Sequence, residues 1–188
     1  MITSLVNFGG ESIIVETPYA LMEGENENAV LIYYIDENGE HHSIINSEYK
    51  DGKVTFKTNH LSRFAVGYNE VHFEDVSGWA QGYITYLAAR NIINGIGSNK
   101  FAPNYNVTRA EFVKMLALLS GDEIPDKPET KFQDVSQKAW YTPYIAWASD
   151  QEYVLGISDT TFAPDKNITR EQVAAIIYRF IIAATCSR

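Results

Sequence analysis

The feature that most constrains this chain is an internal repeat in residues 71–188. The pattern F-x-D-V, then Trp, then G-I, then F-A-P and finally [V/I]-T-R occurs twice. From Trp79 and Trp140 onward the matching residues are 61 positions apart, whereas Phe73 and Phe132, which open the two copies, are 59 apart. A repeat that keeps its register over this length indicates two copies of one supersecondary unit, which must bury their apolar side chains together.

Each copy is predicted to form a helix, a loop and a second helix, over residues 73–119 and 132–180. The loop, at 94–106 in the first copy, is rich in Gly, Asn and Pro, and the linker 120–131 contains two prolines. The helices are predicted from apolar residues at helical spacing: Trp79, Tyr83, Ile84, Leu87 and Ala88 for a helix over 79–90, Phe112, Met115, Leu116 and Leu119 for a helix that begins at Thr108, and Val173, Ile176, Ile177 and Phe180 in the second copy.

The first seventy residues predict strands instead. Short runs of β-branched and aromatic residues are separated by turn sequences that contain Gly, as in an antiparallel sheet. The runs lie at 12–16, 29–35, 41–45, 54–58 and 63–68. The predicted fold class is therefore α+β, with an N-terminal antiparallel β module at 1–70, part of a sandwich and the C-terminal part of a larger module. An all-α pair of helix–loop–helix repeats follows at 71–188.

The charge balance excludes some classes of function. The chain has 24 acidic and 15 basic residues, a net charge of −9, and residues 1–70 alone contain 11 acidic and 4 basic residues. A nucleic-acid binder normally carries a basic surface, so no nucleic-acid partner is expected. No apolar run is long enough to span a membrane. The first ten residues lack the features of a signal peptide, so a chain that works outside the cell is expected to be a fragment of a longer one.

Histidine and cysteine exclude further chemistry. The four histidines, His41, His42, His60 and His72, all precede the repeats, which removes His-based catalysis and most zinc sites from them. His41 and His42 point to opposite faces of a predicted strand and cannot both bind one metal ion. The loop 94–106 lacks the alternating carboxylates of a calcium loop. The single Cys186 allows no internal disulfide. No cofactor and no metal site are predicted.

A capping box is predicted at the start of the second helix of each copy. Thr108 and Glu111, and likewise Thr169 and Gln172, have the spacing at which each residue binds the backbone amide of the other. The box does not explain the arginine that follows each threonine, Arg109 and Arg170. A cation at the first helical position opposes the helix dipole. It therefore indicates either an anionic ligand or a surface salt bridge to a neighbouring acid.

Three further pairs of repeated residues allow two interpretations each. The tryptophans could be core residues, which composition favours, or platforms for a sugar ring. The aspartates could end the chain's entry into a helix, and the glycines could serve only the turn or leave backbone amides open to a ligand. The pairs are Trp79 and Trp140, Asp75 and Asp134, and Gly95 and Gly156.

The combined pattern resembles the S-layer homology motif of bacterial surface proteins, over residues 73–119 and 132–180. The segment 57–62 and the strand after it also resemble the β modules that often precede such motifs. The family often has Gly at the end of the first helix, where this chain has Asn91 and Glu152, residues that must adopt a left-handed conformation there.

The resemblance implies a function and a set of site residues. In the family three motifs normally assemble into a pseudo-threefold spindle, whose grooves bind a secondary cell-wall polymer, typically a pyruvylated glycan. This implies an extracellular place at the bacterial cell wall or S-layer. An arginine that meets a pyruvyl carboxylate makes a charge-assisted contact. The residues that match the family's glycan-binding positions are Arg109, Arg170, Asp75, Asp134, Trp79, Trp140, Gly95 and Gly156.

Two function hypotheses therefore remain. The first is a carbohydrate-binding anchor that is not an enzyme, and the second is a fragment of a surface-attached glycoside hydrolase or other enzyme whose catalytic part is missing or lies in the β module. The β module offers no defensible spacing of a nucleophile and a base, which favours the anchor. Because only two copies are present, we also expect self-association through apolar faces that a third copy would cover.

Overall fold

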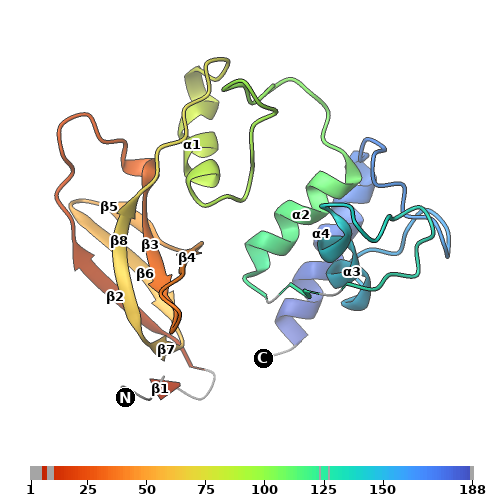
Figure 1. Ribbon diagram of the computed structural model, residues 1–188, viewed down its shortest axis with the longest axis horizontal. Helices are drawn as coiled ribbons and strands as arrows, with labels where there is room; N and C mark the ends of the chain where they lie inside the picture. Colours follow the sequence, from red (N-terminus) through yellow and green to blue (C-terminus); the bar gives the residue numbers. More distant parts are fainter. Residues whose placement is uncertain (1–5, 8–10, 123, 127, 187–188) are drawn as a thin grey trace. The chain divides into compact units, whose positions relative to one another are not determined.

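A computed structural model describes the chain except for residues 1–5, 8–10, 123, 127 and 187–188. The chain divides into two compact units, Met1–Pro103 and Asn104–Arg188. Figure 1 shows the strands and α1 in the first unit and α2, α3 and α4 in the second. None of the described helices has the length and apolar character needed to cross a membrane.

The first unit contains antiparallel strands in small sheets, as predicted. One sheet has the order β2-β6-β5 and another β4-β3-β8, while β1 pairs with β7. Val30 and Ile32 of β3 pack with Val54 and Phe56 of β6, so the two three-stranded sheets share one core. The strands are β1 (Val6–Asn7), β2 (Ile13–Pro18), β3 (Val30–Ile35), β4 (His41–Ile44), β5 (Glu48–Lys50), β6 (Lys53–Thr58), β7 (His60–Leu61) and β8 (Arg63–Tyr68).

Most strand bounds agree with the prediction to within a residue or two, but β1, β5 and β7 were not predicted. Each is only two or three residues long and has no apolar periodicity of its own. The turn before β6 has Asp51 at φ 50° and Gly52 at φ 79°, a left-handed conformation that Gly adopts without strain.

The first repeat's helix α1 (Gln81–Ala89) belongs to this same unit. A short 3-10 turn, η2 (Gly78–Ala80), precedes it, and another, η1 (Glu27–Ala29), contacts it from the strand region. The Tyr86 hydroxyl donates to the backbone carbonyls of Ile45 (3.2 Å) and Ser47 (2.9 Å). These contacts bind the helix to the strands.

Arg90, directly after α1, adds a buried connection that sequence analysis missed. Its Nη1 donates to the carbonyls of Asn28 (3.3 Å) and Tyr86 (3.1 Å), and its Nη2 to the carbonyls of Val30 (3.0 Å) and Ser47 (2.7 Å). The guanidinium also lies 3.5 Å from the centre of the Tyr86 ring. The compact units therefore divide at Pro103, well after the boundary expected at residue 70.

The second unit contains α2 (Arg109–Ser120), α3 (Thr142–Asp150) and α4 (Arg170–Cys186) around one core. Ile145 of α3 and Val113 of α2 are fully buried at its centre, and Ile176 of α4 is 4% exposed. The Trp147 indole donates to Asp122 at 3.2 Å.

The buried faces of the helices differ from the predicted stripes. In α2 the buried residues are Arg109, Ala110, Val113, Leu116 and Ala117, whereas Leu119 of the predicted stripe is 50% exposed. The prediction used only the large apolar residues of α2, but α2 packs closely against α3, and the small residues Ala110 and Ala117 are buried there. Asn91 and Glu152, after α1 and α3, both have φ 57°, the left-handed conformation expected at these positions.

Candidate functional site

The two repeated aspartates hold the F-A-P loops, defined as residues 101–103 and 162–164. Asp134 accepts hydrogen bonds from the backbone amides of Phe162 (2.8 Å) and Ala163 (2.7 Å). In the first copy Asp75 accepts from the backbone amides of Phe101 and Ala102, at 2.8 Å each. The hydrogen bond from the Phe101 amide lowers the pKa of Asp75, and the one from the Ala102 amide lowers it further. Together they outweigh desolvation, which raises this pKa. Asp75 and Asp134 thus fix loops that lie 26 to 29 residues further on.

The hydrogen bonds of Asp75 and Asp134 support an unusual backbone conformation in the F-A-P loops. Ala102 and Ala163, at the centre of the two F-A-P loops, have φ of 59° and 60°. A side chain with a Cβ rarely adopts this left-handed conformation, so bonded neighbours must stabilise it. Two amides bound by one carboxylate in each repeat provide that stabilisation. The interpretation that the aspartates only end the entry into a helix is therefore wrong.

The repeated glycines permit close packing against the phenylalanine that opens each copy. A Cβ at Gly95 would lie 2.5 Å from Phe73 Cε1, and one at Gly156 would lie 2.6 Å from Phe132 Cε1. The amide after each glycine, Ile96 or Ile157, already donates within its own loop at 2.8 Å. Close approach explains both glycines, and the next amides are used internally.

Both capping boxes have their reciprocal hydrogen bonds. The Thr108 hydroxyl accepts from the Glu111 amide at 3.2 Å, and the Glu111 carboxylate accepts from the Thr108 amide at 2.8 Å. The Gln172 amide donates to the Thr169 hydroxyl at 3.3 Å, and the Thr169 amide donates to the Gln172 side chain at 3.2 Å. This geometry begins α2 and α4 without any ligand.

Arg109 is buried at a junction between the two copies. It is 4% exposed, its Nε donates to the Phe162 carbonyl at 2.9 Å, and its guanidinium lies 4.6 Å from the Phe162 ring centre. The amides of Arg109 and Ala110 donate to the carbonyls of Lys166 and Pro164 at 2.9 and 3.0 Å. The first turn of α2, which belongs to copy one, is thus bonded to a loop of copy two.

This contact explains an arginine at the first helical position without a surface salt bridge. Among the residues that the structure describes, no carboxylate lies within 4.0 Å of the Arg109 guanidinium. Desolvation lowers the pKa of Arg109, and the charge of Asp134 partly opposes this shift. Arg170, in contrast, is exposed, and its side chain makes no hydrogen bond or ion pair within the described part of the chain. The two arginines therefore have different surroundings.

The repeated tryptophans lie on the surface, so the expectation that they are core residues is wrong. Trp79 is 86% exposed and Trp140 is 55% exposed. Trp79 contacts Tyr83 at 6.4 Å between ring centres, in the first unit. Trp140 contacts Tyr141 at 5.3 Å, in the second. A large aromatic side chain that stays exposed at both repeat positions is available to a ligand.

Lys114 completes a surface that we call the Trp140 patch, made of Lys114, Trp140 and Tyr141. The Lys114 Nζ lies 5.7 Å from the Trp140 ring centre, and desolvation lowers the pKa of Lys114 against the opposing effect of Glu111. Desolvation, followed by the charges of Asp165 and Asp134, raises the pKa of Tyr141. The patch therefore combines an aromatic face with a cation.

Sequence analysis missed Lys114 for an identifiable reason. The residue 61 positions later is Ala175, so Lys114 is not part of the repeated pattern. It lies in the second turn of α2, among residues whose spacing predicted only a helix. Its place beside a tryptophan of the other copy follows from tertiary packing alone.

Comparison with known proteins identifies the repeats. The family model for the S-layer homology domain matches residues 72–113 and 131–174. This chain carries two S-layer homology repeats. The matched segments include the aspartates, the tryptophans, the glycines and both arginines described above.

Several curated relatives share these repeats. An amylopullulanase of Thermoanaerobacterium thermosulfurigenes is 30% identical over 171 residues, which cover 88% of this chain and 9% of the relative. The surface-layer 125 kDa protein of Lysinibacillus sphaericus is 30% identical over 105 residues (56% of this chain, 9% of the relative). A cellulosome-anchoring protein of Acetivibrio thermocellus is 34% identical over 92 residues (47% and 21%). The chain thus spans a small part of each relative.

Proposed function

We propose that this chain attaches its parent protein to the bacterial cell wall by binding a secondary cell-wall polymer non-covalently. In this proposal two helix–loop–helix S-layer homology repeats form the binding part, and the chain works outside the cell, at the wall or S-layer. The single observation that carries the proposal is the exposed Trp140, within the matched segment 131–174, with Lys114 beside it. The names of two relatives, a surface-layer protein and a cellulosome-anchoring protein, support attachment to a surface.

The chemistry of the Trp140 patch suits an acidic sugar. The apolar face of a sugar ring packs on an aromatic face such as that of Trp140, and the carboxylate of a pyruvyl group accepts charge-assisted hydrogen bonds from a lysine. Arg109 belongs to the same unit but is buried, with its Nε bonded to the Phe162 carbonyl. Because the Lys114 Nζ lies 5.7 Å from the Trp140 ring centre, we assign Lys114 the direct contact with the carboxylate, and Arg109 the positioning of the Phe162 loop.

The other candidate residues have two roles in this proposal. Trp79 and Arg170 are exposed and can contact glycan directly at further positions. Asp134 and Gly156 shape a loop of the second unit, and Asp75 and Gly95 shape the equivalent loop of the first, because their polar atoms and close contacts are used within each repeat.

Variants of the Trp140 patch test this assignment by sedimentation with purified cell-wall sacculi. We expect Trp140→Ala and Lys114→Gln each to weaken binding by about tenfold, since losing one good contact costs about 1.4 kcal/mol. Tyr178→Ala removes another exposed aromatic side chain, and Lys57→Gln another exposed lysine, so both are matched controls. Equal sedimentation of all four variants and wild type would show that the patch is not the binding surface.

The hydrolase fragment stays the second candidate, because two relatives are named as enzymes, an amylopullulanase and an endoglucanase. This chain covers only 9% and 12% of those proteins. Release of reducing sugar from soluble glucans by the purified chain would support this candidate.

Self-association belongs to the same proposal. Leu119 and Ile177 are 50% and 39% exposed on the second unit, which leaves apolar surface for a second copy. Light scattering that gives the mass of one chain at all concentrations would exclude this association.

A further inference from the structure

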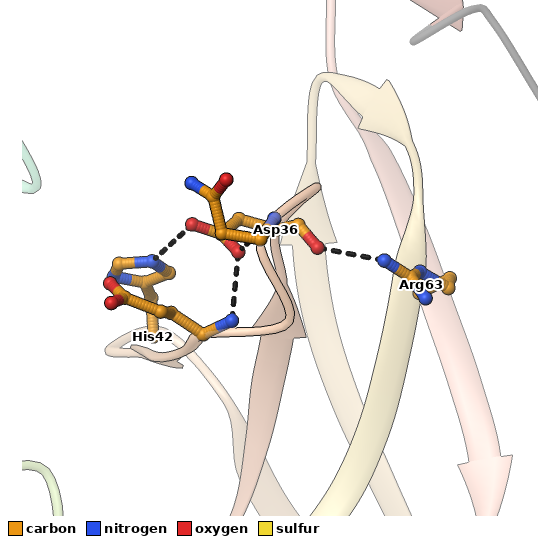
Figure 2. A network of polar contacts seen from close by, with 5 residues as sticks. Asp36, His42 and Arg63 are labelled. Carbon is orange, nitrogen blue, oxygen red and sulfur yellow. Dashed lines mark hydrogen bonds and ion pairs between the residues drawn. The ribbon is translucent and has the colours of Figure 1, made fainter.

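The turn between β3 and β4 brings together three side chains that can bind a metal ion. Asp36, Glu40 and His42 each offer one ligand atom, and these atoms lie within 4.8 Å of one another. Figure 2 shows Asp36 directed toward the His42 ring, with Arg63 on the other side of the turn. The contact between Asp36 Oδ2 and His42 Nε2 is 3.5 Å.

The local fold explains why these residues meet. Asp36 follows β3 directly, and its amide donates to the Glu40 carbonyl at 2.9 Å, which closes the turn. In the β3–β4 register Tyr34 pairs with His42 and Ile35 pairs with His41, and Tyr33 lies two residues before Ile35 on the same face of β3. Because neighbouring strand residues point to opposite faces, His42 lies on the Asp36 side, while His41 packs against Tyr33 on the other.

Asp36 is held in place before any ion binds. Its Oδ1 accepts from the Asn38 amide at 2.9 Å and from the Glu40 amide at 2.8 Å, so its Oδ2 is directed toward His42. Asp36 therefore offers a carboxylate whose second oxygen is already oriented, as in metal sites with outer hydrogen bonds.

We propose that Asp36, Glu40 and His42 bind a divalent transition-metal ion, with Zn²⁺ preferred over Ca²⁺ and Mg²⁺. One imidazole nitrogen and two carboxylates suit Zn²⁺, whereas Ca²⁺ requires six to eight oxygen ligands. The net charge of −7 on residues 1–70, from 11 acidic and 4 basic residues, also favours a cation. Arg63 donates to the Asp36 backbone carbonyl at 2.7 Å, and its charge opposes the ion, so we expect a weak, open site.

This inference differs from the sequence prediction of no metal site. In this part of the chain, that prediction weighed only the pair His41 and His42, which do lie on opposite faces. The carboxylates of Asp36 and Glu40 come close to His42 only because the turn folds back between the strands.

Isothermal titration of the metal-free full chain with ZnCl2 tests the site. We expect one Zn²⁺ per chain, at least about tenfold weaker binding for His42→Ala and Glu40→Gln, and binding within about twofold of wild type for His41→Ala. Glu40 is exposed, so Glu40→Gln keeps the fold even where another variant lowers stability. In NMR spectra, Zn²⁺ should shift the imidazole signals of His42 but not those of His41.

Two results would overturn the proposal. The first is the absence of any Zn²⁺ binding by wild type. The second is equal loss of binding in His41→Ala and His42→Ala, which would move the site away from the turn.

Discussion

Replacing Arg90 by methionine should loosen α1 from the strands of the first unit. Arg90 is 3% exposed, and the variant keeps its length and apolar stem while removing every donor. Four backbone carbonyls, those of Asn28, Val30, Ser47 and Tyr86, then lose a hydrogen bond. The Ser47 carbonyl still accepts from the Tyr86 hydroxyl, so three carbonyls are counted as losing their partner. Buried groups without a partner cost about 1–3 kcal/mol each, so the low end of that range gives about 3 kcal/mol.

Part of this cost is offset because the variant no longer buries a cation. Desolvation lowers the pKa of Arg90, and its buried Nε has no hydrogen-bond partner among the described residues. We therefore expect a net loss of about 1.5 kcal/mol, half of the gross value. For a unit of this size that corresponds to a fall in melting temperature of about 6–12 °C.

Differential scanning calorimetry and hydrogen exchange measure this effect. Arg63→Met is the matched control, because Arg63 is exposed and makes one hydrogen bond to a backbone carbonyl. Arg63→Met should change stability by less than about 0.5 kcal/mol. In Arg90→Met, the amides of α1 should lose exchange protection first. A melting temperature for Arg90→Met within the range of the control would refute the reasoning.

Three other changes test the packing of the repeats. The pKa of Asp75 lies below 3.8, so the stability that its hydrogen bonds contribute should be present above that pH and lost as the pH falls through the lowered pKa. Hydrogen exchange of the loop amides that Asp75 binds should show this loss, and Asp75→Asn should remove the pH dependence. Gly156→Ala should cost more stability than Gly121→Ala in thermal melts, because φ is 71° and 72° at these residues but only Gly156 would place a Cβ against other atoms. Thr108→Ala and Thr169→Ala should each cost about 0.5–2 kcal/mol with unchanged wall affinity per folded molecule, and a loss of affinity at full stability would contradict the capping role.

The sequence predicted the regular elements well, because local signals determine them. The alternation in Lys53–Thr58 and the turn glycines determine β6 and its neighbours. The capping residues Thr108 and Thr169 determine where α2 and α4 begin. These interactions span a few residues, so they are visible in the sequence.

The surroundings of the site residues were harder to predict. Arg109 and Arg170 occupy equivalent positions in the repeat, yet Arg109 is buried against Phe162 while Arg170 is exposed. The two tryptophans are apolar enough for a core but lie on the surface. Such differences depend on which loop packs against each copy, and that is a property of the tertiary structure.

The central claim is that the chain binds a polymer of the cell wall, and sedimentation with two preparations of sacculi tests it most directly. One preparation keeps its secondary polymer, and the other has had the polymer removed chemically while the peptidoglycan stays intact. We predict saturable sedimentation of the wild-type chain with the first preparation and none above background with the second. Equal sedimentation with both preparations would contradict the claim.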